Sequence, residues 1–150
     1  MEIGQEIKQL KFRNEYHKSI VNVIFTSNWL LEKMRIMLDR EDITHQQYNI
    51  LRILKGSASP LSTLQIRERM LDRMSDTSRI VERLIKKGLA DKKLCSYDKR
   101  LVDITLTGKG FELLERLEGM NDEIDAIVHG LSTEEAVALN NLLDKLREND

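Results

Sequence analysis

The sequence predicts a mainly α-helical fold that carries one small β-hairpin. Along most of the 150 residues, apolar side chains recur at the spacing of amphipathic helices. Three stretches begin with Ser or Thr followed three residues later by Gln or Glu, which is the pattern of a capping box at a helix N-terminus. By contrast, residues 101–106 (LVDITL) alternate apolar and polar side chains, as a strand with one buried face does.

Length and composition favour one globular domain. The chain is 41% hydrophobic and 33% charged, which is too charged for a membrane protein and too apolar for a disordered one. Its most apolar window, residues 20–38, contains Glu32, Lys33 and Arg35 and therefore does not predict a membrane span. The first ten residues lack the apolar core of a secretory signal, and Cys95 is the single cysteine. We therefore expect a cytoplasmic location and no internal disulfide.

The first expected helix covers residues 6–38, which contain no Gly or Pro. In its second half, apolar residues that include Phe25 and Trp29 occupy more than one face. One face is therefore expected to contact something beyond the core of its own subunit.

The three capping boxes predict helices that begin after Thr44, Ser62 and Ser132. The sequences of the boxes are THQQ, STLQ and STEE, and each is followed by apolar residues at helical spacing. The connector GSASP at 56–60 contains Pro60, the only proline, and separates the first two of these helices.

Another helix is expected over residues 75–87, with Ser75 as its N-cap and Gly88 after its last turn. Val81, Leu84 and Ile85 form its apolar stripe. The outward face begins with small hydroxyl side chains and continues with arginines, and it contains Ser75, Asp76, Thr77, Ser78, Arg79, Arg83 and Lys86. This composition suits a DNA groove, because hydroxyls and helix-terminal amides reach phosphates or base edges and arginine can bind guanine through two hydrogen bonds.

A hairpin is expected from strands at 89–94 and 101–106. Thr107 is then expected to cap a long helix whose apolar residues run from Phe111 to Val128. Gly108 and Gly110, both in the first turn of that helix, suggest a backbone that packs closely against a neighbour.

Charge is distributed unevenly along a chain whose net charge is -1. Residues 1–60 carry a net charge of +2, whereas residues 61–110 hold twelve Lys or Arg against seven Asp or Glu, a net charge of +5. Residues 111–150 hold three against eleven, a net charge of -8. The basic segment fits a nucleic-acid surface, although solvated helix faces would give the same counts.

The helices at 62–72 and 75–87, joined by a very short turn, form a helix-turn-helix, and the hairpin that follows makes it winged. The segment DKRLVDITLTGKG at 98–110 matches the D-x-R-(x)5-L-T-x-x-G signature of the MarR family of bacterial transcriptional regulators. Residues 78–89 (SRIVERLIKKGL) also resemble the recognition helix of that family and its Lys-Gly-Leu exit. The resemblance covers residues 40–115 by motif and the whole chain by the order of its elements.

The resemblance implies that Arg100 at the wing tip enters the DNA minor groove, with Asp98 paired to an arginine and Lys99 on a phosphate. A narrow minor groove concentrates negative potential and attracts a guanidinium. In the major groove, the resemblance places the first residues of the recognition helix, Ser75, Thr77, Ser78 and Arg79. Asp76 there either accepts a hydrogen bond from a cytosine amino group or pairs with Arg73 or Arg79, and the sequence does not choose between these.

Members of the family are dimers whose first and last two helices interlock. The resemblance therefore implies a DNA-binding lobe at 40–110 and a dimerisation lobe built from 1–38 and 111–150. Two-fold symmetry would require a near-palindromic operator with half-sites about 34 Å apart. The expected dimer contacts are Ile7, Leu10, Tyr16, Leu139, Leu142, Leu143 and Leu146.

Family members often bind small aromatic or lipophilic effectors on the first long helix, where this chain has Trp29, Met34 and Met37. The same three side chains at helical spacing are also typical of plain core. Cys95 adjoins the wing and is either a bystander or a thiol whose oxidation disturbs DNA binding.

The residue pattern contains no metal or cofactor motif and no catalytic arrangement. His17, His45 and His129 are widely separated in the sequence, and no Ser-His-acid or Cys-His grouping can be argued. This argues against an enzyme, and the resemblance implies a ligand-responsive, homodimeric, DNA-binding repressor. The alternative is a winged-helix module that binds a protein partner and has no specific DNA site.

Overall fold

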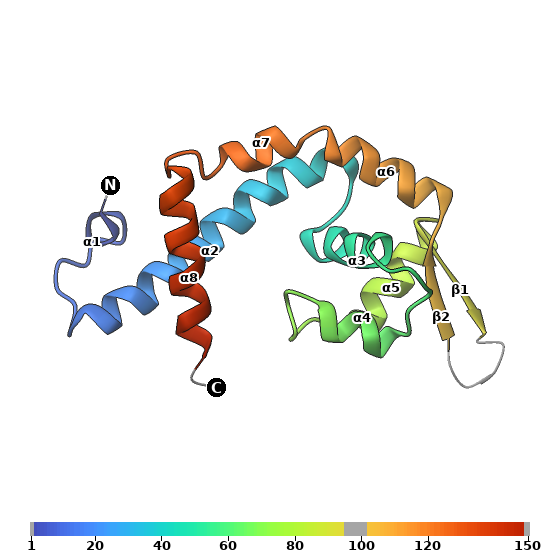
Figure 1. Ribbon diagram of the computed structural model, residues 1–150, viewed down its shortest axis with the longest axis horizontal. Helices are drawn as coiled ribbons and strands as arrows, with labels where there is room; N and C mark the ends of the chain where they lie inside the picture. Colours follow the sequence, from blue (N-terminus) through green and yellow to red (C-terminus); the bar gives the residue numbers. More distant parts are fainter. Residues whose placement is uncertain (1, 95–101, 149–150) are drawn as a thin grey trace. The chain divides into compact units, whose positions relative to one another are not determined.

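The computed structural model describes residues 2–94 and 102–148. In these ranges the chain forms helices, one 3-10 helix and one antiparallel hairpin (Figure 1), which confirms the predicted fold class. Residues 1–114 and 115–150 form two separate compact units. The elements in chain order are α1 (Ile3–Glu6), α2 (Glu15–Leu38), η1 (Asp39–Glu41), α3 (His45–Lys55), α4 (Thr63–Arg69), α5 (Thr77–Lys86), β1 (Ala90–Leu94), β2 (Val102–Leu106), α6 (Gly108–Glu118), α7 (Asn121–Ala126) and α8 (Thr133–Arg147).

The helix expected over residues 6–38 is wrong at its N-terminal end, where the chain forms α1 and then a separate α2. Lys8 adopts a left-handed backbone conformation (φ 55°), which an α-helix does not continue through. Asn14 then caps α2, because its side chain accepts a hydrogen bond of 2.9 Å from the backbone N–H of His17. Ile7 and Leu10 therefore lie in the connection between the helices rather than on a helical stripe.

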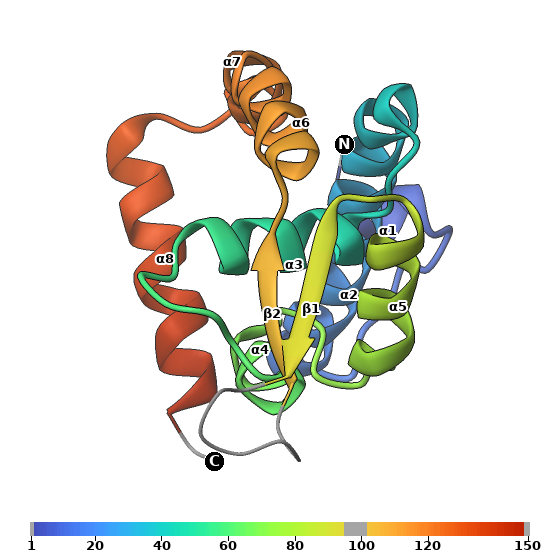
Figure 2. The ribbon, with the colours of Figure 1, turned by 90° about the vertical axis from the view of Figure 1, so that its right-hand side faces the viewer.

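The core of the first unit lies where α3, α4, α5 and the hairpin meet. Figure 2 shows the two strands side by side, with α5 beside β1 and α3 crossing behind them. Leu61, in the connector before α4, also pairs with β2 through two backbone hydrogen bonds to Ile104, of 3.1 and 2.8 Å. Large side chains that are fully buried here are Ile50, Leu51, Leu61, Ile66, Leu84, Ile104 and Leu114.

The predicted capping boxes are confirmed at the starts of α3, α4 and α8, where both reciprocal hydrogen bonds are present. The single long helix expected after Thr107 is wrong, because α6 ends at Glu118 and α7 begins at Asn121. Gly119 lies at the interruption, which fits the low helix propensity of glycine. Among described residues, no helix combines the length and apolarity that crossing a bilayer requires.

Hydrogen bonds join the residues that follow α5 to the residues that precede α6. Gly88 takes a left-handed conformation (φ 71°), and the Thr107 hydroxyl donates a hydrogen bond of 2.7 Å to its carbonyl oxygen. Thr107 also caps α6, because its Oγ1 accepts from the Gly110 N–H at 3.0 Å. A Cβ on Gly110 would lie 2.2 Å from the Leu89 carbonyl oxygen, whereas a Cβ on Gly108 would meet nothing within 4 Å. The expected close packing is confirmed for Gly110 and is wrong for Gly108.

The two glycines predict opposite effects of alanine. Gly110→Ala should lower the free energy of unfolding by roughly 1–3 kcal/mol or more, because backbone atoms would have to move to accept the methyl group. Gly108→Ala, the matched control, should be neutral or stabilising by about 0.5 kcal/mol, because alanine restricts the unfolded chain. Urea denaturation followed by circular dichroism at one fixed protein concentration would measure both. Equal stability of the two variants would contradict this account of the junction.

Candidate nucleic-acid interface

Helix α5 begins at a cap that the sequence did not identify. Asp76, not Ser75, is its N-cap, and the Asp76 carboxylate accepts a hydrogen bond of 3.1 Å from the Arg79 N–H. The Ser75 hydroxyl instead donates a bond of 2.7 Å to the Asp72 carbonyl oxygen within the preceding turn. Within the described ranges, no ion pair joins Asp76 to Arg73 or Arg79, so the structure gives this carboxylate a capping role.

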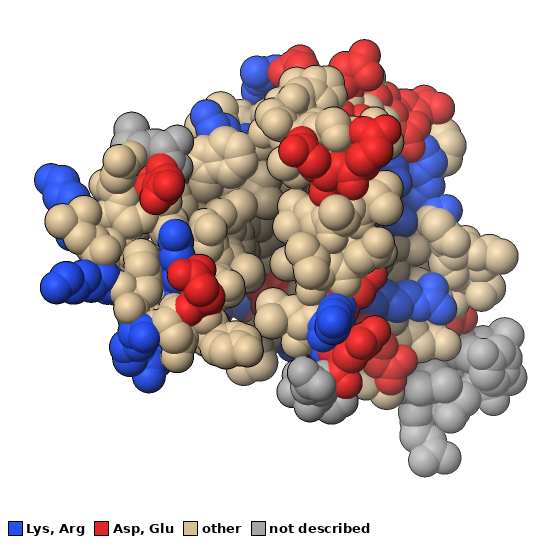
Figure 3. Space-filling view, turned by 60° about the vertical axis from the view of Figure 1, so that its left-hand side comes forward, with Lys and Arg blue, Asp and Glu red and all other residues tan. Residues whose placement is uncertain are grey.

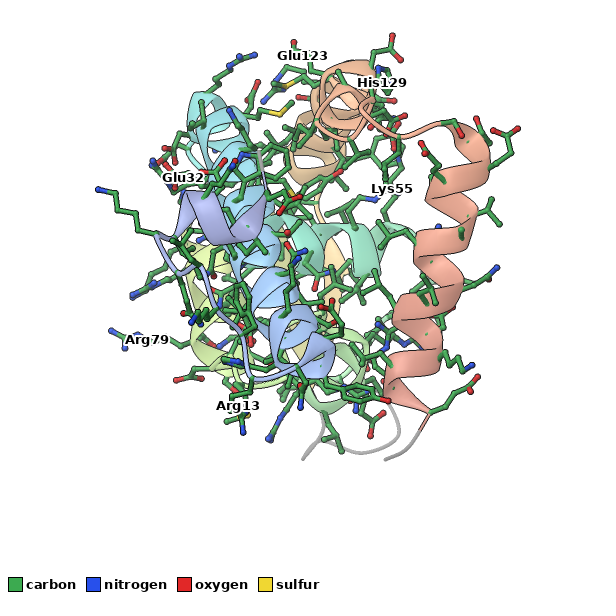
Figure 4. The ribbon with its side chains drawn as sticks, turned by 90° about the vertical axis from the view of Figure 1, so that its left-hand side faces the viewer. Arg13, Glu32, Lys55, Arg79, Glu123 and His129 are labelled. Atoms are coloured by element: carbon green, nitrogen blue, oxygen red, sulfur yellow. The ribbon has the colours of Figure 1, made fainter. Side chains whose placement is uncertain are left out.

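The outward face of α5 carries two arginines. Ser78, Arg79, Glu82, Arg83 and Lys86 are exposed, and Figure 4 shows the Arg79 side chain extending outward from the helix. The opposite face is buried through Ile80, Val81 and Leu84. Among the residues described, neither Arg79 nor Arg83 forms an ion pair, so their guanidinium groups are open to an external anion.

Thr77 corrects the predicted outward face. Its side chain is only 4% exposed, and its Oγ1 has no hydrogen-bond partner among the described residues. It is the first residue of α5 and packs inward, so its expected place on the outward face of the helix is wrong. The sequence pattern did not predict this inward orientation, because a threonine in the first turn of a helix can face either the core or the solvent.

The turn between α4 and α5 is held by two side chains of α3. Gln46 donates a hydrogen bond of 2.7 Å from Nε2 to Oδ2 of Asp72, and the Asn49 side chain accepts one of 2.9 Å from the Leu71 N–H. Oδ1 of Asp72 also accepts from the Met74 N–H at 3.1 Å. These bonds fix the chain just before the N-terminus of α5. Sequence reasoning missed them, since Gln46 and Asp72 are 26 residues apart.

The wing strands are in register from Ala90 opposite Leu106 to Leu94 opposite Val102. Lys92 of β1 forms an ion pair of 2.7 Å with Glu82 of α5, which ties the wing to the recognition helix. Both side chains are about half exposed, so the pair contributes little stability and serves mainly to orient the two elements. The candidate wing-tip residues Asp98, Lys99 and Arg100, and also Cys95, lie outside the described residues.

Five of the seven candidate dimer residues are apolar side chains that the single chain leaves exposed. Leu10, Tyr16 and Leu142 are 86%, 82% and 66% exposed, and Leu139 and Leu146 are also exposed. Ile7 and Leu143 are half-buried. Figure 3 shows acidic and basic side chains interspersed with broad areas of neither charge on the face that it presents.

Trp29, which the sequence nominated for an effector pocket, lines a cavity of about 370 Å³ between α1 and α2. Met34 and Met37 do not line that cavity: Met37 is buried, and Met34 is half-buried. Across the parts of the chain that are described, no group of three or more His, Cys, Asp or Glu residues could hold a metal ion.

A characterised relative matches nearly the whole chain. No protein-family model matches the sequence. FarR of Neisseria gonorrhoeae, an HTH-type transcriptional regulator, is 30% identical over 132 residues, which cover 87% of this chain and 90% of FarR.

Two solved structures share the fold at low sequence identity. A cysteine-to-serine mutant of MarR from E. coli, complexed with operator DNA, has a TM-score of 0.80 at 20% identity, covering 91% of this chain and 99% of MarR. The organohalide-sensing regulator RdhR-CbdbA1625, in its 2,4-dichlorophenol-bound form, has a TM-score of 0.81 at 21% identity, covering 93% of this chain and 87% of that one. Together with FarR and the winged helix-turn-helix described above, these likenesses place the chain in the MarR family of DNA-binding transcriptional regulators, which are not enzymes.

Proposed function

We propose that this protein is a homodimeric, cytoplasmic repressor that binds a near-palindromic operator and releases it when a small lipophilic or aromatic molecule binds. The main support for a DNA-binding surface comes from the outward face of α5. Arg79 and Arg83 are exposed there and form no ion pair among the described residues. Asp76 caps this helix, and α3 holds the turn before it. The two arginines therefore project from a fixed support, which lowers the entropic cost of placing them in a groove.

Helix α5 and the wing would contact different grooves of the DNA. Ser78, Arg79 and Arg83 would read the major groove, since arginine binds guanine O6 and N7 through two hydrogen bonds. Arg100 would enter the adjoining minor groove, with Asp98 orienting its guanidinium and Lys99 contacting a phosphate. MarR of E. coli, which has the same fold, has been crystallised with operator DNA, and this supports the arrangement.

The homodimer is supported by the exposed apolar residues of α2 and α8. An isolated chain that left Tyr16, Leu139, Leu142 and Leu146 exposed would be prone to association, and a two-fold interface would bury them. The ligand response is supported by the cavity beside Trp29 and by RdhR-CbdbA1625, which was crystallised with 2,4-dichlorophenol. Release of bound operator on addition of such compounds tests the response directly.

Operator binding should depend on Arg79 and not on Thr77. A duplex selected from genomic fragments with the purified protein, then labelled, would serve as the probe in fluorescence anisotropy. Arg79→Ala should weaken binding by about 1–3 kcal/mol, because a base or phosphate contact is lost. Thr77→Val should leave the affinity unchanged, because this side chain is buried. Arg147→Ala removes an exposed arginine of α8 and serves as the control.

The same assay distinguishes a DNA reader from a winged-helix module that binds a protein. Phosphate contacts make log K fall with log[salt] by roughly 0.9 for each phosphate neutralised, whereas a protein partner gives a shallower dependence. Arg100→Ala should reduce both the affinity and this slope. If no duplex is enriched, or if Arg79→Ala and Arg100→Ala bind as the wild type does, the operator-binding proposal is wrong.

The dimer should depend on the apolar face of α8. Leu142→Glu would place a charge in a buried interface, so it should shift the mass from two subunits toward one in light scattering coupled to size exclusion. Leu71→Glu, at a still more exposed leucine in the turn before α5, should remain dimeric. A wild-type mass of one subunit at micromolar concentration would refute the homodimer.

A further inference from the structure

The hollow between α1 and α2 has the size of a small-molecule site, and one charged side chain is among its lining residues. It measures about 370 Å³, which falls in the range of small-molecule sites, about 300–1,000 Å³. Its lining residues are Ile3, Glu6, Asn22, Phe25, Thr26 and Trp29. On α2, Phe25 and Thr26 each lie three or four residues from both Asn22 and Trp29, so the four share one side of the helix. Helix α1 supplies the remaining wall.

The wall formed by α1 is held in place by its own fold. Ile3 is buried, and the Gly4 carbonyl oxygen accepts a hydrogen bond of 2.9 Å from the Gln9 N–H. A Cβ on Gly4 would lie 2.9 Å from the Gln9 carbonyl oxygen and 3.6 Å from the Phe12 ring. This close packing requires glycine, and it fixes the short helix from which Glu6 extends.

The chemistry of the lining selects a cation. Glu6 is the only charged residue among those that line the cavity, and the described residues contain no ion pair to it. Phe25 and Trp29 supply aromatic surface, whose rings attract cations as well as apolar groups. One cation already uses this property, because Nζ of Lys33 lies 6.0 Å from the centroid of the Trp29 ring. A carboxylate ligand would instead be repelled by Glu6.

We propose that this cavity binds a small organic cation with an apolar aryl or alkyl body. Its ammonium group pairs with the Glu6 carboxylate, its body lies against Phe25 and Trp29, and Asn22 and Thr26 accept remaining ammonium hydrogens. The inference rests on the proposed ligand response for its regulatory meaning, but the binding itself involves neither α5 nor the wing.

Trp29 makes the binding directly observable, since it is the only tryptophan in the chain. We would titrate the full-length protein with phenylbutylamine, phenylbutanol and phenylbutyrate, which share a body and differ in charge, and follow tryptophan emission. The amine should give a saturable change and bind about tenfold more tightly than the alcohol, because it adds a charged hydrogen bond. The carboxylate should produce no saturable change.

Substitutions of Glu6 test the charge assignment. Glu6→Gln should abolish the preference for amine over alcohol, whereas Glu6→Asp should keep it. Glu2→Gln removes a neighbouring exposed acid that does not line the cavity, and it should behave as the wild type does. Circular dichroism would establish that each variant folds. Equal binding of the three compounds, preference for the carboxylate, or an amine preference that survives Glu6→Gln would overturn the proposal.

A parallel operator-binding measurement separates this site from the proposed function. If phenylbutylamine changes Trp29 emission with the expected Glu6 dependence but does not release operator, the site stands and the proposed ligand response fails. If lipophilic compounds release operator without Glu6 dependence and without a change in Trp29 emission, the response stands and this site is wrong.

Discussion

The winged helix-turn-helix depends on one junction, where the end of α5 meets the start of α6. Gly88 turns the chain out of α5 in a left-handed conformation, and its carbonyl oxygen accepts from the Thr107 hydroxyl. Nζ of Lys109 donates a further bond of 2.9 Å to the Lys87 carbonyl oxygen. Gly110 lies so close to the Leu89 carbonyl that no larger residue fits. Because both wing strands begin or end at this junction, it sets the angle between recognition helix and wing. In this structure Thr107 and Gly110 of the Leu-Thr-x-x-Gly motif hold the junction together.

At its other end, α5 is positioned by α3. Gln46 and Asn49 bond the turn before the helix, and Ile50 and Leu51 of α3 are fully buried in the core that α5 also enters. Helix α3 therefore holds α5 in position. Both ends of α5 are fixed by hydrogen bonds, and its middle is fixed by burial, so the direction of Arg79 and Arg83 is determined by elements that need not touch DNA.

The features that could be predicted from the sequence are those whose causes lie within a few residues. The capping boxes at Thr44, Ser62 and Ser132 are complete within four residues, and the cap by Thr107 is equally local. The missed features depend on distant partners or on a choice between similar local signals. Ser75 and Asp76 are both good N-cap residues, and only the bond between Ser75 and Asp72 decides between them. The inward side chain of Thr77 and the contact between Gln46 and Asp72 follow from the packing of α3 against α5, which no short pattern encodes.

The long helix α2 is linked to the same junction that orients the recognition helix. Arg35 near the end of α2 binds Glu32 and Asp39, its guanidinium lowers the pKa of Glu32 below its usual value, and Asp39 begins η1. Asp42 follows η1 in a left-handed conformation and is held by Lys87, whose ammonium bonds the Asp42 carbonyl oxygen and pairs with its carboxylate at 3.1 Å. The carbonyl oxygen of the same Lys87 accepts the bond from Lys109. The end of α2 is thus connected to the C-terminal end of α5 by successive polar contacts. Under the proposed ligand response, this is the route that would link a site on α2 to the orientation of α5.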